Sequence, residues 1–273
     1  MRIGIIGYGN MGQAIAHRLR ELDYEIIVFD KDKNKIKRLK DITVAQNNCD
    51  LVNKVDILIL AIKPQDFAVV LREIKNYIKE KLLISIAAGI STAYIEGALG
   101  DIRVIRVMPN LGVKVAESVS CLCKGRFATD KDLKVAKGLF SRLGTTAVIE
   151  EKMMNAATAI SGSGPGYIFD FLETNSLNPN NLSEDTSREI IRRLESAARK
   201  LGFNSKEATF LAVNTLKSSL ALIKKTQLSP QTLKKQVASK GGTTEAALKI
   251  LHEGGSWEEA AQAALKRAEE LAR

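Results

Sequence analysis

The sequence predicts an α/β fold with a Rossmann-type, doubly wound and mostly parallel sheet in an N-terminal domain, followed by an all-α C-terminal domain. A glycine-rich turn, GYGNMG, follows an apolar run at the N-terminus. Short apolar runs then alternate with amphipathic segments. Beyond about residue 150 the strand signal ends and helical patterns rich in Ala and Leu take over. We therefore expect domains over residues 1–151 and 152–273.

The composition is that of an ordinary globular protein. The 273 residues are enough for two domains, each with its own core. The net charge is +10, but the basic residues are interleaved with acidic ones and form no aromatic-containing basic patch, so we expect no nucleic-acid partner. No apolar run reaches the length of about 18 residues that a membrane span needs, so we expect no membrane partner. The three cysteines lack disulfide or zinc spacing, which predicts no metal site and a cytoplasmic protein.

Seven apolar runs are the expected strands. They are apolar on successive residues rather than on alternate ones, which is typical of strands covered on both faces. In chain order they are RIGIIG, EIIVFD, DILILAI, LLISIAA, RVIRVM, SVSCLC and TAVI.

Four helical segments are expected in the second domain, over residues 152–160, 167–174, 184–201 and 206–225. Ser229 followed by Pro230 predicts a further helix start, and Ser256 with Glu259 predicts a capping box for the last helix. The last helices are apolar on more than one face, so we expect a second copy of the chain to cover them.

The first glycine turn has the spacing of a dinucleotide site. Gly7, Gly9 and Gly12 follow a strand and open a helix, which is the context that close approach of the backbone to a pyrophosphate requires. Asn10 and Met11 lie between the second and third glycines and are expected among the cofactor contacts. The alternative is a purely structural turn in another kind of α/β protein.

The end of the second strand predicts the cofactor preference. A carboxylate at Asp30 can accept hydrogen bonds from the adenosine ribose and repels a 2′-phosphate, which favours NADH. Lys31 and Lys33 are close by in sequence and could partly accommodate the phosphate of NADPH. The sequence leaves NADH and NADPH open.

A second glycine turn, SKGGTT, precedes a C-terminal helix. Glycines and threonines before a helix are typical of an anion site, because free N–H groups and the positive end of the helix dipole face the ligand there. The sequence thus predicts two anion sites, one in each domain.

Several segments resemble one family, the Δ1-pyrroline-5-carboxylate reductases. In the family's order they are DILILAIKPQ, LISIAAGI, VIRVMPN, AISGSGPGYIF and SKGGTTEAAL, in addition to the N-terminal turn. The resemblance implies an NADPH- or NADH-dependent enzyme that makes L-proline from its cyclic imine. It also implies that the C-terminal domain forms a homodimer, or a dimer-based higher oligomer, and binds the imino acid.

The resemblance assigns further cofactor contacts to residues near the ends of strands. Open α/β sheets bind ligands at this carboxyl edge. The expected contacts are Asn48, Ala61, Lys63, Pro64, Met108, Pro109 and Asn110, the last three beside the nicotinamide.

The resemblance assigns the second turn to the carboxylate of the substrate. The implied contacts are Ser239, Gly241, Gly242, Thr243 and Thr244. Thr244 is the hydroxyl expected nearest the imine nitrogen, as an orienting donor with a relay role. The loop is implied to reach the nicotinamide of the neighbouring subunit, so that the active site is shared.

The chain departs from the family in three places. Leu111 and Gly112 follow MPN where the family has Thr-Pro, and Ala238 stands where a threonine is frequent. Residues 175–193 read as an insertion next to the dimer core.

Two other functions stay open. A related imine or β-hydroxyacid dehydrogenase would need a catalytic lysine or acid early in the second domain, where Lys152 and Asp170 are the candidates. His17 and His252 lie in no matching motif. The second alternative is a dinucleotide-binding regulator without catalysis.

Overall fold

The computed structural model describes residues 1–271. These residues form two compact units, the first made of residues 1–107 and 122–142, the second of residues 108–121 and 143–271. The expected division after residue 151 follows the end of the strand signal. The second compact unit instead includes residues 108–121 and 143–151 together with the helices that follow.

Eight strands form one sheet with the order β3-β2-β1-β4-β5-β6-β7-β8. Every pairing from β3 through β6 is parallel, and this strand order is that of a Rossmann sheet. The strands are β1 Arg2–Ile6, β2 Glu25–Phe29, β3 Thr43–Val44, β4 Ile57–Leu60, β5 Leu82–Ser85, β6 Arg103–Met108, β7 Ser118–Lys124 and β8 Gly144–Val148. The predicted fold class is confirmed. Only β3 was not expected, because two residues carry no detectable pattern.

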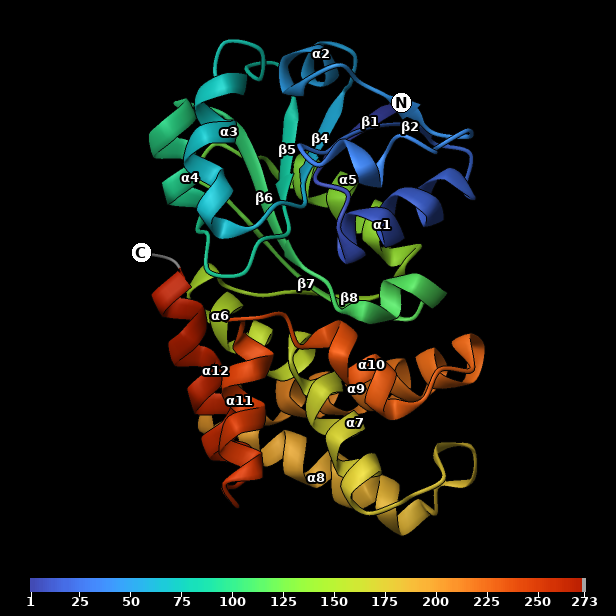
Figure 1. Ribbon diagram of the computed structural model, residues 1–273. Coiled ribbons are helices and arrows are strands. Elements are labelled where there is room, and N and C mark those ends of the chain that lie inside the picture. The colour runs from blue at the N-terminus through green and yellow to red at the C-terminus, as the bar shows by residue number, and fades with distance from the viewer. Residues whose placement is uncertain (272–273) are drawn as a thin grey trace. The chain divides into compact units, whose positions relative to one another are not determined.

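Helices cover both faces of the first unit's strands, which explains their continuous apolar runs (Figure 1). One apolar cluster joins α2, α3 and α4 to residues such as Leu58 and Leu60 of β4. Ile15 and Leu19 of α1 are buried as well. Each such side chain contributes about 1.5–3 kcal/mol on burial. The helices of this unit are α1 Asn10–Arg20, η1 Lys33–Lys35, α2 Asn48–Asn53, η2 Pro64–Asp66, α3 Phe67–Ile74, α4 Thr92–Leu99 and α5 Asp130–Ser141.

The second unit is dominated by helices, which confirms the predicted helical domain. Among them, α11 packs on α12, α8 on α9, and α7 on α10. The expected caps are confirmed, with the Ser229 Oγ accepting from the Thr232 N–H and a reciprocal pair between Ser256 and Glu259. The helices are η3 Leu111–Val115, η4 Glu151–Met153, α6 Met154–Ala157, η5 Thr158–Gly162, α7 Gly164–Thr174, η6 Pro179–Asn181, α8 Glu184–Lys200, α9 Ser205–Thr226, α10 Pro230–Val237, α11 Thr243–His252 and α12 Trp257–Leu271.

The SGSGPGY segment is more helical than expected. Its glycines and proline predict a hinge or a close backbone approach before a helix that starts at Tyr167, whereas α7 already begins at Gly164. It follows the π-helical turn η5, a form often found at functional sites. Proline fits here because the first turn of a helix needs no N–H from it.

Across residues 1–271, no helix combines the length and the apolar character of a membrane span. The same residues contain no cluster of three or more His, Cys, Asp or Glu side chains suited to a metal ion.

Candidate functional site

The glycines of the first turn are required by sterics. Gly7 has a positive φ of 99°, and its N–H donates to the Phe29 carbonyl at 2.8 Å. A Cβ added to Gly7 would lie 2.5 Å from the Ala61 carbonyl oxygen, and a Cβ on Gly12 would collide with the Gly7 carbonyl oxygen. Any side chain at either position therefore forces the turn apart.

The start of α1 offers free donors. Its N-cap is Gly9, which provides no side-chain cap, and the first turn carries no acidic residue. The N–H groups of Asn10, Met11 and Gly12 thus have no intrahelical acceptor. A Cβ on Gly9 would meet no atom within 4 Å, so a ligand can approach the backbone closely there.

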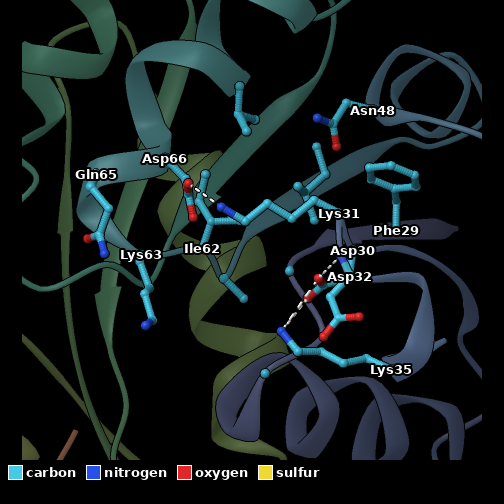
Figure 2. Close-up of a pocket in the computed structure, with 15 residues that line it drawn as sticks. Phe29, Asp30, Lys31, Asp32, Lys35, Asn48, Ile62, Lys63, Gln65 and Asp66 are labelled. Carbon is cyan, nitrogen blue, oxygen red and sulfur yellow. Dashed lines mark hydrogen bonds and ion pairs between the residues drawn. The ribbon is translucent and has the colours of Figure 1, made fainter. Parts of the chain in front are cut away.

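A pocket of about 410 Å³ lies beside this turn in the first unit (Figure 2). Predicted cofactor residues line much of it, namely Gly7, Gly9, Asp30, Lys31, Asn48, Ala61 and Lys63. Pro64 begins η2 next to the pocket, while Asn10, Met11 and Gly12 form the first turn of α1. The sequence missed Phe29, Lys35, Gln65 and Asp66, although KPQD and DKDK lie beside predicted contacts.

Asp30 is held firmly at the end of β2. Its side chain is buried, and its two oxygens accept from the N–H groups of Tyr8 (2.7 Å) and Asp32 (2.8 Å). Lys35 Nζ approaches to 3.3 Å. The carboxylate is thereby fixed at the pocket wall, with lone pairs left for ribose hydroxyls.

Two lysines of the pocket, Lys31 and Lys35, are paired with acids. Figure 2 shows Lys31 reaching to Asp66, with 2.5 Å between Nζ and Oδ1. That hydrogen bond and the negative charge of Asp66 raise the pKa of Lys31. Lys33 lies over the Phe29 ring at 4.1 Å. The basic side chains thus do not form an unopposed phosphate site.

Asn48 is the first residue of α2 and is largely buried. Its Nδ2 donates to Glu73 at 2.6 Å, which fixes the direction of the amide. Its Oδ1 is buried without a hydrogen-bond partner. Because an unpaired buried acceptor is costly, this oxygen is suited to a donor on a ligand.

The MPN segment ends β6 and belongs to the second unit. Met108 packs near Gly162, whose added Cβ would lie 3.9 Å from the Met108 sulfur. The Asn110 Oδ1 accepts from Gly112 N–H, Val119 N–H and Ser218 Oγ. A Cβ on Gly112 would collide with Ser218 Oγ. The local packing therefore requires glycine at this position, where the family has the proline of Thr-Pro.

The second glycine turn, residues 239–242, leads into α11. The N-cap is Gly242 and supplies no side-chain cap, as at α1. Gly241 has a φ of 70°, and its carbonyl accepts from Arg267 Nε at 2.8 Å. Its N–H donates to the Glu245 carboxylate at 2.6 Å. The Gly241 N–H of the turn is therefore already hydrogen-bonded to a carboxylate of the protein itself.

Two buried threonines follow the turn. The Thr244 hydroxyl donates to Ser163 Oγ at 3.1 Å, and Thr243 Oγ1 lies 2.9 Å from the same oxygen. Ser163 was not among the expected site residues, although the family resemblance implies that the SGSGPGY segment lines the active site.

The residues that a β-hydroxyacid dehydrogenase would need are otherwise engaged. Lys152 is exposed and paired with Glu150, whose hydrogen bond and charge raise the pKa of the lysine. Asp170 is paired with Lys234 (2.8 Å) and His252 (2.9 Å). His17 Nε2 lies 3.0 Å from the Tyr8 hydroxyl.

Two family patterns match the chain. Residues 2–89 match the family described as NADP oxidoreductase coenzyme F420-dependent. Residues 186–271 match pyrroline-5-carboxylate reductase dimerisation. The second match begins at residue 186, so residues 186–193 of the insertion predicted over 175–193 lie inside the family pattern, and the remainder stays a prediction.

Relatives match nearly the whole chain. The pyrroline-5-carboxylate reductase of Methanosarcina acetivorans is 35% identical over 93% of this chain and 90% of its own length. That of Aquifex aeolicus is 34% identical with the same coverage. The crystal structure of Plasmodium falciparum pyrroline carboxylate reductase with NADP bound is 27% identical, with a TM-score of 0.66 over 100% of this chain and 98% of that one. The resemblance inferred from the motifs is confirmed, and the chain belongs to the pyrroline-5-carboxylate reductase family.

Proposed function

We propose that this protein reduces 1-pyrroline-5-carboxylate to L-proline with a reduced nicotinamide dinucleotide. The observation that carries the proposal is 35% identity to a pyrroline-5-carboxylate reductase over 93% of the chain. Two helix starts without side-chain caps support it, one for the dinucleotide and one for the substrate carboxylate.

The first turn is proposed to hold the pyrophosphate on the N–H groups of α1. Asp30 would bind the ribose, and Asn48, Ala61, Lys63 and Pro64 would complete the cofactor site. We propose a preference for NADH, because the Asp30 carboxylate faces the pocket and the nearby lysines are paired with acids. The Plasmodium structure has NADP bound, which supports a nicotinamide dinucleotide as the cofactor. NADP differs from NAD by one additional phosphate.

The second turn is proposed to hold the carboxylate of the imino acid. Free N–H groups in the first turn of α11 are the donors, together with the Ser239 and Thr243 hydroxyls. Thr244 would contact the imine nitrogen. Met108, Pro109 and Asn110 are proposed to lie beside the nicotinamide.

The chemistry asks mainly for orientation. When bound, the reduced nicotinamide would supply a hydride to the carbon of the protonated imine, whose C=N π pair would become the lone pair of the amine nitrogen. Holding the two rings at reacting distance supplies several kcal/mol of the barrier reduction. The protein's part is to bind, align and exclude water.

The family match to a dimerisation region supports self-association. We propose a homodimer in which the second turn of one protomer completes the site of the other, with a dimer-based higher oligomer as a further state. The three free cysteines support a reducing, cytoplasmic location.

The direct test follows the absorbance of the reduced nicotinamide with purified protein and 1-pyrroline-5-carboxylate. Substrate-dependent oxidation, with L-proline as the product, is the expected result. Tight cofactor binding by folded protein without turnover would select a non-catalytic regulator. Turnover of a β-hydroxy acid in place of the imine would select the related dehydrogenase.

The substrate assignment is tested with Thr244→Val combined with Gly242→Ala. A Cβ at Gly242 collides with Ser239 Oγ and distorts the turn. KM for the imino acid should rise at least about tenfold, since charge-assisted hydrogen bonds are lost. Cofactor affinity should stay within about twofold, and equal damage to both would contradict the assignment.

A further inference from the structure

Ser163 is a buried hydroxyl that connects two segments far apart in sequence. It precedes α7 and has no measurable exposure. Its Oγ lies 2.9 Å from Thr243 Oγ1 and accepts the hydroxyl proton of Thr244 at 3.1 Å. Ser163 therefore contacts both threonines proposed for the substrate site.

Two other buried serines in this unit, Ser161 and Ser219, behave differently. Ser161 Oγ donates to the Ala157 carbonyl at 2.9 Å and Ser219 Oγ to the Thr215 carbonyl at 2.8 Å. Those bonds stay within one turn of helix and satisfy the hydroxyl locally. Ser163 instead makes side-chain bonds to another helix and provides no cap to its own.

The Thr244 side chain is fixed on two sides by the SGSGPGY segment. Its methyl group packs on Gly166, where an added Cβ would lie 2.5 Å from Thr244 Cγ2. Its hydroxyl is bonded to Ser163. Because a β-branched side chain has few χ1 choices, these two contacts define the direction of Oγ1.

We propose that Ser163 is a positioning residue for the reduction, an inference that rests on the proposed function. By accepting the hydroxyl proton of Thr244, Ser163 leaves the lone pairs of Thr244 Oγ1 free to accept a hydrogen bond from the substrate. The matching donor is the N–H of the imine in its protonated form. Thr244 then acts as an oriented acceptor, which revises the donor role that the sequence suggested.

This arrangement agrees with the electron balance of the step. The protonated imine receives the hydride at carbon, and its C=N π pair becomes the lone pair of a neutral secondary amine that keeps its N–H. The nicotinamide is oxidised, and no proton leaves the protein. A threonine is a poor acid, so an acceptor role suits it better than proton donation.

The neighbouring Tyr167 supplies no competing charge. Its hydroxyl donates to the Ala159 carbonyl at 2.9 Å, and burial raises the pKa of this phenol by more than its hydrogen bond with Ser163 lowers it. It therefore remains protonated and neutral at ordinary pH. The orientation of Thr244 depends on the Ser163 hydroxyl.

The test is a double-mutant cycle on the full-length protein with Ser163→Ala, Thr244→Val and the combination. Ser163→Ala should lower kcat about tenfold, the effect of one hydrogen bond that orients a reacting group, while KM changes less than about threefold. In the Thr244→Val background, Ser163→Ala should have less than about a twofold further effect, because the group it positions is gone. Ser219→Ala, which removes a local hydroxyl bond of similar burial, should behave like the wild type.

Several outcomes would overturn the inference. If the kcat losses of the two single variants multiply in the double variant, Ser163 matters only for packing. Equal kcat losses in Ser163→Ala and Ser219→Ala would lead to the same conclusion. If Ser163→Ala does not fold, Ser163→Cys replaces it, since a thiol of similar size is a weak acceptor and should still lower kcat. If the wild type binds the dinucleotide without any turnover, both the proposed function and this inference are wrong. If the wild type is active but the effects of the two substitutions on the activation free energy add independently, only the inference is wrong.

Discussion

The two glycine turns of the chain look alike in sequence but are built differently. At the first turn, Gly7 and Gly12 are required because the backbone leaves no room for a Cβ, and the contacts come from the turn and the strand ends beside it. At the second turn, Gly241 is bonded to Glu245 and Arg267, and the threonines that follow are held by Ser163. The first turn is therefore determined by local sterics, whereas the second depends on distant side chains.

The largest expected effect comes from the first turn. Gly12→Ala places a Cβ against the Gly7 carbonyl, so it should lower stability by about 1–3 kcal/mol and weaken dinucleotide binding at least about a hundredfold. Gly9→Ala meets no protein atom and should leave the melting temperature nearly unchanged. Gly9→Ala should still weaken binding of the dinucleotide about tenfold, because the methyl group blocks the approach of the pyrophosphate to the backbone.

Calorimetric titration and thermal melts separate these two glycines. Gly97→Ala in α4 is the matched control, since its Cβ also meets no atom within 4 Å and lies in a helix. It should bind dinucleotide normally. Equal losses of stability in Gly9→Ala and Gly12→Ala would contradict the steric account.

Asp30→Ser tests the ribose end of the same pocket. Loss of the carboxylate removes a ribose acceptor and a repulsive charge, so the ratio of kcat/KM for NADH to that for NADPH should fall about tenfold or more. Asp30→Asn is the second variant, because it removes the charge but keeps one of the two oxygens that accept from the Tyr8 and Asp32 N–H groups. An unchanged ratio in both variants would place the selection elsewhere.

Glu245→Gln tests the second turn. The Glu245 carboxylate holds the Gly241 N–H and would compete with the substrate carboxylate for it. Removing the charge should lower KM for the imino acid about two- to fivefold, with little effect on cofactor binding. Glu253→Gln, at the other end of α11, should leave KM unchanged. A rise in KM for Glu245→Gln would indicate that the carboxylate instead orders the turn for binding.

The smallest effect concerns α12, which carries the Arg267 that holds the second turn. Hydrogen bonds from the Ser256 N–H and hydroxyl hold the pKa of Glu259 below its ordinary value of 4.5. This stabilisation is present above that ordinary value and is lost as pH falls through the lower pKa of the folded state. Glu259→Gln should therefore flatten the dependence of the melting temperature on pH below 4.5. A parallel shift at all pH values would contradict the linkage.

Local sequence patterns were sufficient to predict the Rossmann sheet, the helical second half and the first turn, because these show as apolar runs and glycine spacing. The same patterns predicted the caps at Ser229 and Ser256, since a cap needs only three or four successive residues. The ordered motifs then identified the family, and the match to relatives over 93% of the chain confirmed it.

Which side chains surround each turn depends on how distant elements pack, and sequence patterns did not predict it. Lys35 and Asp66 line the dinucleotide pocket through side-chain contacts that no local pattern encodes. Ser163, at the N-cap of α7, and Thr244 of α11 are 81 positions apart in sequence, and their hydroxyl contact arises when α7 and α11 pack. Sequence periodicity records which face of a helix is buried. It does not record which buried hydroxyl meets which, because that depends on how distant helices are placed in space.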